Sequence, residues 1–233
     1  MSKINLLNLF KEFCKKNKFE INFSQIKVIV ELDKFLNSKK TIFNSIFKKN
    51  NKLCFYLVGS VGVGKTMILN FVYDQLNIKK LRLHFNEFMI NFHDFKHNNA
   101  KKEGNLVSLF VKNLKKKYEL IYLDEFQVTN IVDAMILGKL FEEIFSENIK
   151  IIITTNIKLD DLYKDGLQRE QFLPFIAVIK TNSIQQELLI EDDYRIKNID
   201  QLQRIFYPLN ENTSFKINKS FHEFTKGKKR EKK

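Results

Sequence analysis

The chain has 233 residues, a hydrophobic content of 44% and a formal charge of +13, from 40 Lys and Arg residues against 27 Asp and Glu residues. This composition supports a folded core, and because no run of 18 apolar residues occurs, we expect no transmembrane helix. Lys11 and Glu12 interrupt the apolar stretch at residues 4–13, and no small-residue cleavage site follows it, so we expect no signal peptide. With only Cys14 and Cys54 available, no disulfide framework can form, and we expect a cytoplasmic protein.

The positive charge leaves several kinds of partner open. Lys, Asn, Ile and Phe are used heavily and Trp is absent, a bias typical of compositional drift across a whole proteome. That bias favours solvated surface lysines over a dedicated nucleic-acid surface. Nucleic acid, an acidic protein partner and peripheral contact with an anionic membrane stay as alternatives.

Residues 1–50 are predicted to form an N-terminal helical segment, because apolar residues recur there at helical spacing. The apolar face comprises Ile26, Ile29, Val30, Leu32, Phe35 and Leu36. A polar connector at residues 47–52 leads to a predicted core at residues 51–197. Residues 198–233 are polar and lysine-rich, and we expect a disordered tail.

Strands and helices alternate through the core. Strands are predicted at residues 53–58, 81–85, 120–123, 150–155 and 184–190. Helices are predicted from the loop after the first strand to residue 76, then at 87–95 with Asn86 as N-cap, and at 106–114, 130–146, 159–163 and 168–180. This alternation predicts an α/β fold with a parallel five-stranded sheet flanked by helices.

A glycine-rich loop between the first strand and its helix is the most informative motif. It reads Gly59-Ser60-Val61-Gly62-Val63-Gly64-Lys65-Thr66, followed by Met67. Strand, glycine-rich turn and helix are the setting in which backbone N–H groups and a helix N-terminus bind phosphate. We therefore predict a P-loop NTPase with a nucleotide site at residues 59–67, in which Lys65 reaches the β- and γ-phosphates and Thr66 ligates Mg²⁺.

Polar residues end the next strong strands of the predicted sheet. Asp124 and Glu125 follow the strand at 120–123, and Asn156 follows the strand at 150–155. Carboxyl ends of parallel strands meet at one edge, where α/β sheets bind ligands. Asp124 is predicted to hold Mg²⁺, Glu125 to activate the attacking water, and Asn156 to bridge that water and the γ-phosphate.

Arg169 stands shortly after the fourth strand, at the predicted start of a helix. An arginine that a neighbouring subunit supplies accelerates phosphoryl transfer, and Arg169 is the candidate; an ordinary surface arginine is the alternative. His84, Glu87 and His93 lie close in sequence but do not have the spacing of a metal-ligand set. We expect the two histidines to serve packing or partner contacts.

Together these segments resemble the ZapE-type AAA+ ATPases of bacterial cell division, whose eukaryotic relatives are mitochondrial. The resemblance covers roughly residues 20–210 and is most specific at residues 124–137 and 166–176. Its motifs are Tyr56-Leu57-Val58-Gly59 through Met67, Leu83-His84-Phe85-Asn86-Glu87-Phe88-Met89, Leu123-Asp124-Glu125-Phe126-Gln127-Val128-Thr129, Asp161 to Arg169, Phe172-Leu173-Pro174-Phe175-Ile176 and Asp193-Tyr194-Arg195.

The resemblance implies an AAA+ (ASCE-type) fold, Mg²⁺-dependent ATP hydrolysis, assembly into a homo-oligomer, and action on the tubulin-like FtsZ of the division ring. It also supports Arg169 as the arginine that a neighbouring subunit supplies to the site. Gln171 stands where relatives often carry a second arginine, and Leu159 replaces a usual proline. Relatives usually continue well past the Asp193-Tyr194-Arg195 segment. A nucleic-acid-associated AAA+ loader and a non-hydrolysing, ATP-gated adaptor are the alternative functions.

Overall fold

The computed structural model describes residues 5–38, 52–101 and 103–189, and its central feature there is a sheet of five parallel strands. The strands lie in the order β2-β3-β4-β1-β5. Their bounds are β1 (Cys54–Gly59), β2 (Lys80–His84), β3 (Leu120–Asp124), β4 (Lys150–Thr155) and β5 (Ser183–Leu188). The predicted parallel five-stranded sheet is confirmed. The predictions for residues 190–233 and most of the connector at 47–52 fall outside the described residues.

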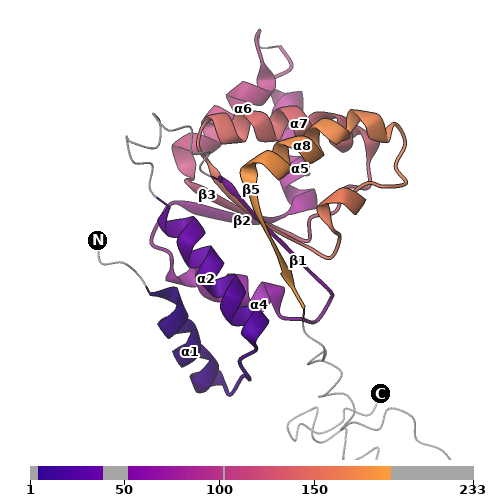
Figure 1. Ribbon diagram of the computed structural model, residues 1–233. Coiled ribbons are helices and arrows are strands. Elements are labelled where there is room, and N and C mark those ends of the chain that lie inside the picture. Colours follow the sequence, from indigo (N-terminus) through magenta and orange to yellow (C-terminus); the bar gives the residue numbers. More distant parts are fainter. Residues whose placement is uncertain (1–4, 39–51, 102, 190–233) are drawn as a thin grey trace, which may run out of the picture. The chain divides into compact units, whose positions relative to one another are not determined.

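Helices cover both faces of this sheet (Figure 1). One face carries α1 (Leu6–Asn17), α2 (Phe23–Asn37) and α4 (Lys65–Gln75). The other carries α5 (Phe85–Asn98), α6 (Leu106–Lys117), α7 (Ile131–Ser146) and α8 (Leu173–Asn182). Two short 3₁₀ turns, η1 (Leu159–Asp161) and η2 (Arg169–Gln171), lie between β4 and α8.

Successive side chains of the buried strands point to alternate faces of the sheet, and this divides the core into two layers. In β1, Phe55 and Leu57 pack with α1, α2 and α4, whereas Cys54 and Tyr56 pack with the helices on the opposite face. Successive side chains of a strand point to opposite faces, so an unbroken apolar run produces a strand buried on both sides. The apolar strands in the sequence therefore place the sheet at the centre of three layers.

Asparagine caps fix where several helices begin. Asn130 Oδ1 accepts a 2.7 Å hydrogen bond from the backbone N–H of Val132 at the start of α7. Asn105 caps α6 in the same way, with its Oδ1 3.1 Å from the backbone nitrogen of Val107. Each cap satisfies a backbone N–H group that has no partner within the helix.

The N-terminal helices share a core with the sheet. Phe10 of α1 packs edge-on against Phe71 of α4, and Phe35 of α2 lies 5.7 Å from Phe55 of β1. Lys150, the first residue of β4, donates hydrogen bonds to the carbonyl oxygens of Phe35 and Leu36 at the end of α2. Burial lowers the pKa of Lys150. Apolar packing and a lysine cap thus hold α2 on the sheet.

Two predicted helix starts are wrong. Asn86 is not an N-cap, because α5 begins at Phe85 directly after β2, with no loop between them. The predicted helix at 168–180 is divided into η2 and α8. Gln168 has a positive φ of 53°, and α8 begins at Leu173, next to Pro174. Proline tolerates only the first turn of a helix, since it has no N–H group and its ring clashes with the preceding turn.

No helix in the described part of the chain is long and apolar enough to cross a membrane.

Two glycine-to-alanine substitutions should have opposite effects on stability. A Cβ at Gly59 would lie 2.9 Å from the backbone oxygen of Leu188 in β5, whereas one at Gly138 in α7 would meet nothing closer than 3.4 Å. We expect Gly59→Ala to lower the free energy of unfolding by about 1–3 kcal/mol, because backbone must move. Gly138→Ala should be neutral or stabilise by up to about 1 kcal/mol through helix propensity. Urea denaturation measures both; equal midpoints would contradict the close packing of β1 and β5.

Candidate functional site

The carboxyl ends of β1, β3 and β4 bring the predicted site residues to one edge of the sheet. β4 pairs with β1 on one side and with β3 on the other. Asn156, directly after β4, therefore emerges between the glycine loop at the end of β1 and the carboxylates of Asp124 and Glu125 at the end of β3. Three segments that are distant in sequence converge as predicted.

The glycine loop has the backbone shape that its sequence predicts. Gly62 and Gly64 both have φ of 91°, a region that residues with a Cβ rarely adopt. Gly64 forms the N-cap of α4, so the loop leads directly into a helix N-terminus. Val63 is buried beneath the loop and Val61 projects into solvent. The resulting turn, with helix N–H groups at its end, is suited to an anion such as phosphate.

Lys65 lies across this loop. Its Nζ donates hydrogen bonds to the carbonyl oxygens of Gly59 and Ser60, at 2.6 and 2.8 Å. Thr66 is exposed beside it and Met67 is half-buried. The lysine charge is thus already positioned at the loop by the first residues of the loop itself.

Asp124 is a buried carboxylate that stays ionised. Burial by itself raises its pKa, but hydrogen bonds from Thr154 and Arg82 outweigh burial, so the pKa of Asp124 lies below its ordinary value. Thr154 Oγ1 donates to Asp124 Oδ1, and Arg82 Nη2 donates to Asp124 Oδ2 at 2.8 Å. Arg82 also lies over the ring of Tyr122. A buried anion held in this way can act as a ligand for a hard cation.

Glu125 differs from its neighbour in almost every respect. Its side chain is 80% exposed, against 6% for Asp124, and its φ of 53° is unusual for a residue with a side chain. The backbone on both sides is held: Glu125 N–H donates to Asp124 Oδ1, and the N–H of Phe126 donates to the carbonyl of Thr154. The exposed Glu125 carboxylate lies on the side of β2, which ends at His84. His84 Nδ1 lies 3.6 Å from this carboxylate.

The segment around Asn156 is fixed by the threonine before it. Thr155 Oγ1 donates to the carbonyl of Phe126 at 2.8 Å and accepts from the backbone N–H of Ile157 at 3.1 Å. Tyr56 OH bonds to the carbonyl of Ile157. The exposed Asn156 side chain therefore projects from a rigid turn.

Thr66 and Asp124 provide donors that match a magnesium site. Mg²⁺ is usually held by one or two carboxylates together with substrate phosphates and water, and a P-loop hydroxyl completes that set. The low pKa of Asp124 leaves its carboxylate charged for this purpose. Within the described ranges, no group of three or more His, Cys, Asp or Glu side chains is arranged to hold a metal alone. A magnesium ion here would therefore be coordinated partly by the protein and partly by bound phosphate.

Arg169 contacts its own chain. Its guanidinium donates to the carbonyl oxygens of Leu162 and Asp160, at 2.7 and 2.6 Å, and so closes the loop between η1 and η2. The structure thus places it in η2, away from the start of a long helix. Its action between subunits stays a prediction.

The two histidines serve contacts of different kinds. His93 Nε2 lies 2.7 Å from Asp133 Oδ1 and joins α5 to α7, while His84 faces Glu125. A role of either histidine in contacts with a partner stays a prediction.

Sequence reasoning missed Arg82 and Thr154, the two residues that hold Asp124. Arg82 had a visible signal, since it is a charged residue within the strand Leu81-Arg82-Leu83. Thr154 could be found only from the pairing of β3 with β4. Both act through contacts between strands, which local patterns do not reveal.

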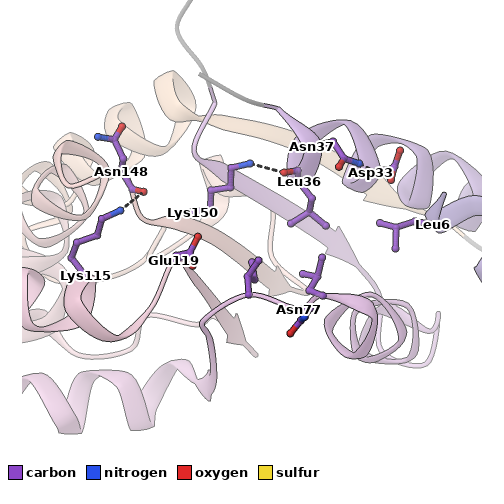
Figure 2. Close-up of a pocket in the computed structure, with 11 residues that line it drawn as sticks. Leu6, Asp33, Leu36, Asn37, Asn77, Lys115, Glu119, Asn148 and Lys150 are labelled. Carbon is purple, nitrogen blue, oxygen red and sulfur yellow. Dashed lines mark hydrogen bonds between the residues drawn. The ribbon is translucent and has the colours of Figure 1, made fainter. Parts of the chain in front are cut away.

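A cavity of about 500 Å³ lies at the other edge of the sheet, beside the starts of β3 and β4 (Figure 2). Figure 2 shows Lys115 bonded to Asn148, and Lys150 bonded to the end of α2. Asp33 and Glu119 also line it. Because the two lysines already bond to backbone carbonyls, the cavity offers no clear anion site.

Comparison with known proteins gives a family and a fold. The family model described as AFG1-like ATPase matches residues 18–233. Cell division protein ZapE of Escherichia coli (strain K12) is 33% identical over 175 residues, which are 75% of this chain and 46% of that protein. Lactation elevated protein 1 homolog B of Danio rerio is 35% identical over 164 residues, 66% of this chain and 33% of that protein. The chain thus spans less than half the length of these relatives.

Solved structures confirm the fold. DnaI has a TM-score of 0.51 at 20% identity, covering 74% of this chain and 89% of its own. AMPPCP-bound DnaA from Aquifex aeolicus also has a TM-score of 0.51, at 16% identity, covering 91% of this chain and 64% of its own. The fold is that of the P-loop NTPases, as the sequence predicts.

Removing Arg82 should destabilise the protein in a pH-dependent way. We expect Arg82→Met to lower the free energy of unfolding at pH 7 by about 1–3 kcal/mol, because Asp124 loses a charged hydrogen-bond donor. The pKa of Asp124 is lower in the folded state than in the unfolded state, so its ionisation stabilises the fold at pH values above the ordinary aspartate pKa. This stabilisation is lost as the pH falls through the folded-state pKa. The difference in the free energy of unfolding between wild type and Arg82→Met should therefore become smaller below about pH 4.

Urea denaturation at pH 7 and pH 3 measures this effect. Lys180→Met is the matched control, since Lys180 forms an exposed ion pair with Asp160 and should cost less than about 0.5 kcal/mol. A deficit of the same size at both pH values would show that Arg82 stabilises by packing alone.

Proposed function

This chain belongs to the AFG1-like ATPase family, and from that premise we propose that it binds ATP at residues 59–67 and hydrolyses it with Mg²⁺. The observation that carries the proposal is the contrast at the end of β3. The buried, ionised carboxylate of Asp124 is followed in sequence by the exposed carboxylate of Glu125. Both lie at the end of β3, and only β4 separates β3 from β1, the strand that leads into the phosphate loop.

Each residue has a role that its surroundings support. Backbone N–H groups from Gly59 to Gly64 surround the phosphates, and Lys65 neutralises their charge. Thr66 and Asp124 would hold Mg²⁺, which would supply positive charge to stabilise the negative charge that develops on the phosphates. Met67 would contact the nucleotide at the start of α4.

Glu125 and Asn156 would act on the attacking water. The Glu125 carboxylate projects from the sheet edge, where it can orient a water molecule and accept its proton. Asn156, between Glu125 and the loop, would hydrogen-bond the same water and the γ-phosphate. The rigid backbone around both residues is the kind of pre-organisation that such a step requires.

We further propose that the protein works as a homo-oligomer on a protein assembly of bacterial cell division, the FtsZ ring, because a relative bears the name cell division protein ZapE. Arg169 would complete the site of a neighbouring copy. To do so, its guanidinium must leave the carbonyls of Leu162 and Asp160 or use its remaining N–H donors. A loader acting with nucleic acid is the alternative that the charge of +13 favours.

Glu125→Gln should separate binding from hydrolysis. We expect the ATP turnover rate to fall by about 100-fold or more, because the general base is lost, while the dissociation constant for ATP changes little. Steady-state phosphate release and equilibrium titration measure the two quantities. Glu142→Gln, an exposed substitution on α7, removes the same charge and should leave turnover unchanged. Unchanged turnover in Glu125→Gln would show that Glu125 does not activate the water.

Mixing two inactive variants tests Arg169. A site completed between subunits predicts a turnover rate per chain that rises with protein concentration, and a loss of roughly 10³-fold in Arg169→Ala. Glu125→Gln supplies an intact Arg169 and Arg169→Ala an intact Glu125, so an equimolar mixture should regain activity. Lys164→Ala in the same loop is the control. A mixture no more active than its components would show that Arg169 acts within its own chain.

A further inference from the structure

Gln25 of α2 is a buried polar side chain that lies against the phosphate loop. It is the third residue of α2 and only 2% exposed. A Cβ built at Gly64 would lie 3.5 Å from Gln25 Nε2 and 3.6 Å from the terminal methyl of Met67. The amide and the thioether therefore flank the same side of the last loop glycine.

The cap of α2 fixes the orientation of this amide. The backbone N–H of Asn22 donates to Gln25 Oε1 at 3.3 Å, and Asn22 Oδ1 accepts from the N–H of Ser24 at 2.8 Å. Only the amide oxygen can accept from an N–H group, so the amide nitrogen must be the atom that faces the loop. Helix capping thus directs two N–H donors towards Gly64.

These donors form no hydrogen bond within the described part of the chain. Among the described residues, the buried side-chain atoms without a hydrogen-bond partner are Asn70 Oδ1 and Ser183 Oγ, so Gln25 Nε2 is not a fully enclosed donor although its residue is only 2% exposed. The amide nitrogen therefore remains open on the side of the loop, where a Cβ at Gly64 would lie 3.5 Å from it. A ligand held by the loop can supply the acceptor.

We propose that Gln25 is a nucleotide-binding residue whose amide donates a hydrogen bond to the nucleoside part of the ligand held by the loop. This inference rests on the proposed ATP site. In the proposed site, the phosphates accept hydrogen bonds from the backbone N–H groups of the loop. The side of Gly64 that faces Gln25 and Met67 instead combines a hydrogen-bond donor with an apolar surface. That combination suits a base or sugar, which presents acceptor atoms together with apolar faces.

Two variants of Gln25 separate the donor from the cap. Gln25→Glu keeps an oxygen for the Asn22 N–H and removes the two donors; Gln25→Met removes the donors without adding charge. We expect both to bind MgATP roughly 3- to 15-fold more weakly, the range that one hydrogen bond supports. The affinity of Gln25→Met for inorganic tripolyphosphate with Mg²⁺ should stay unchanged, since that probe has no nucleoside.

Calorimetric titration of the whole chain with both probes gives the answer. Asn22→Ala is the structural control: it loses the bond to Ser24 N–H, so its melting temperature should fall while its ATP affinity is kept. Equal ATP affinity in wild type and Gln25→Met would overturn the inference, and so would an equal loss for ATP and tripolyphosphate, which would mean that Gln25 only shapes the loop. If the wild type bound ATP no better than Lys65→Ala, the proposed function itself would fail, and this inference with it.

Discussion

Hydrogen bonds from two adjacent threonines of β4 hold the end of β3, and the candidate site depends on them. Thr154 bonds to the carboxylate of Asp124, and Thr155 bonds to the carbonyl of Phe126. Glu125 lies between these two fixed points, and its backbone adopts a left-handed conformation. Strain of this kind persists only where neighbouring contacts impose it. Because β4 also pairs with β1, the same strand sets the position of the carboxylates relative to the phosphate loop.

The two neighbouring carboxylates differ in burial and in their contacts. Asp124 is buried, and hydrogen bonds from Thr154 and Arg82 outweigh the effect of burial and hold the pKa of its carboxyl below the ordinary value. Glu125 is exposed, and His84 Nδ1 lies 3.6 Å from its carboxylate. Pairs of carboxylates in unlike environments commonly divide their tasks, one holding charge and the other exchanging a proton. The difference in burial here follows from which residues the neighbouring strands place beside each carboxylate.

The loop, the strands and the polar strand ends could be predicted because their signals are local. An apolar run followed by glycines and Lys65 needs no tertiary information. Arg82 could not be assigned, since its partner Asp124 is 42 residues away and only the pairing of β2 with β3 joins them. The break before α8 was missed for another reason. Apolar periodicity continues across it, whereas the chemistry of Pro174 decides where the helix begins.

Helix α2 extends the site beyond the segments that carry its motifs. Its first turn places Gln25 beside Gly64, and its last turn is bound by Lys150, the first residue of β4. The last turn of the helix is thus hydrogen-bonded to the strand that also positions the carboxylates, and its first turn lies beside the glycine loop. The N-terminal layer thus acts as a fixed wall of the candidate site, even though a segment outside the described residues separates it from β1 in sequence.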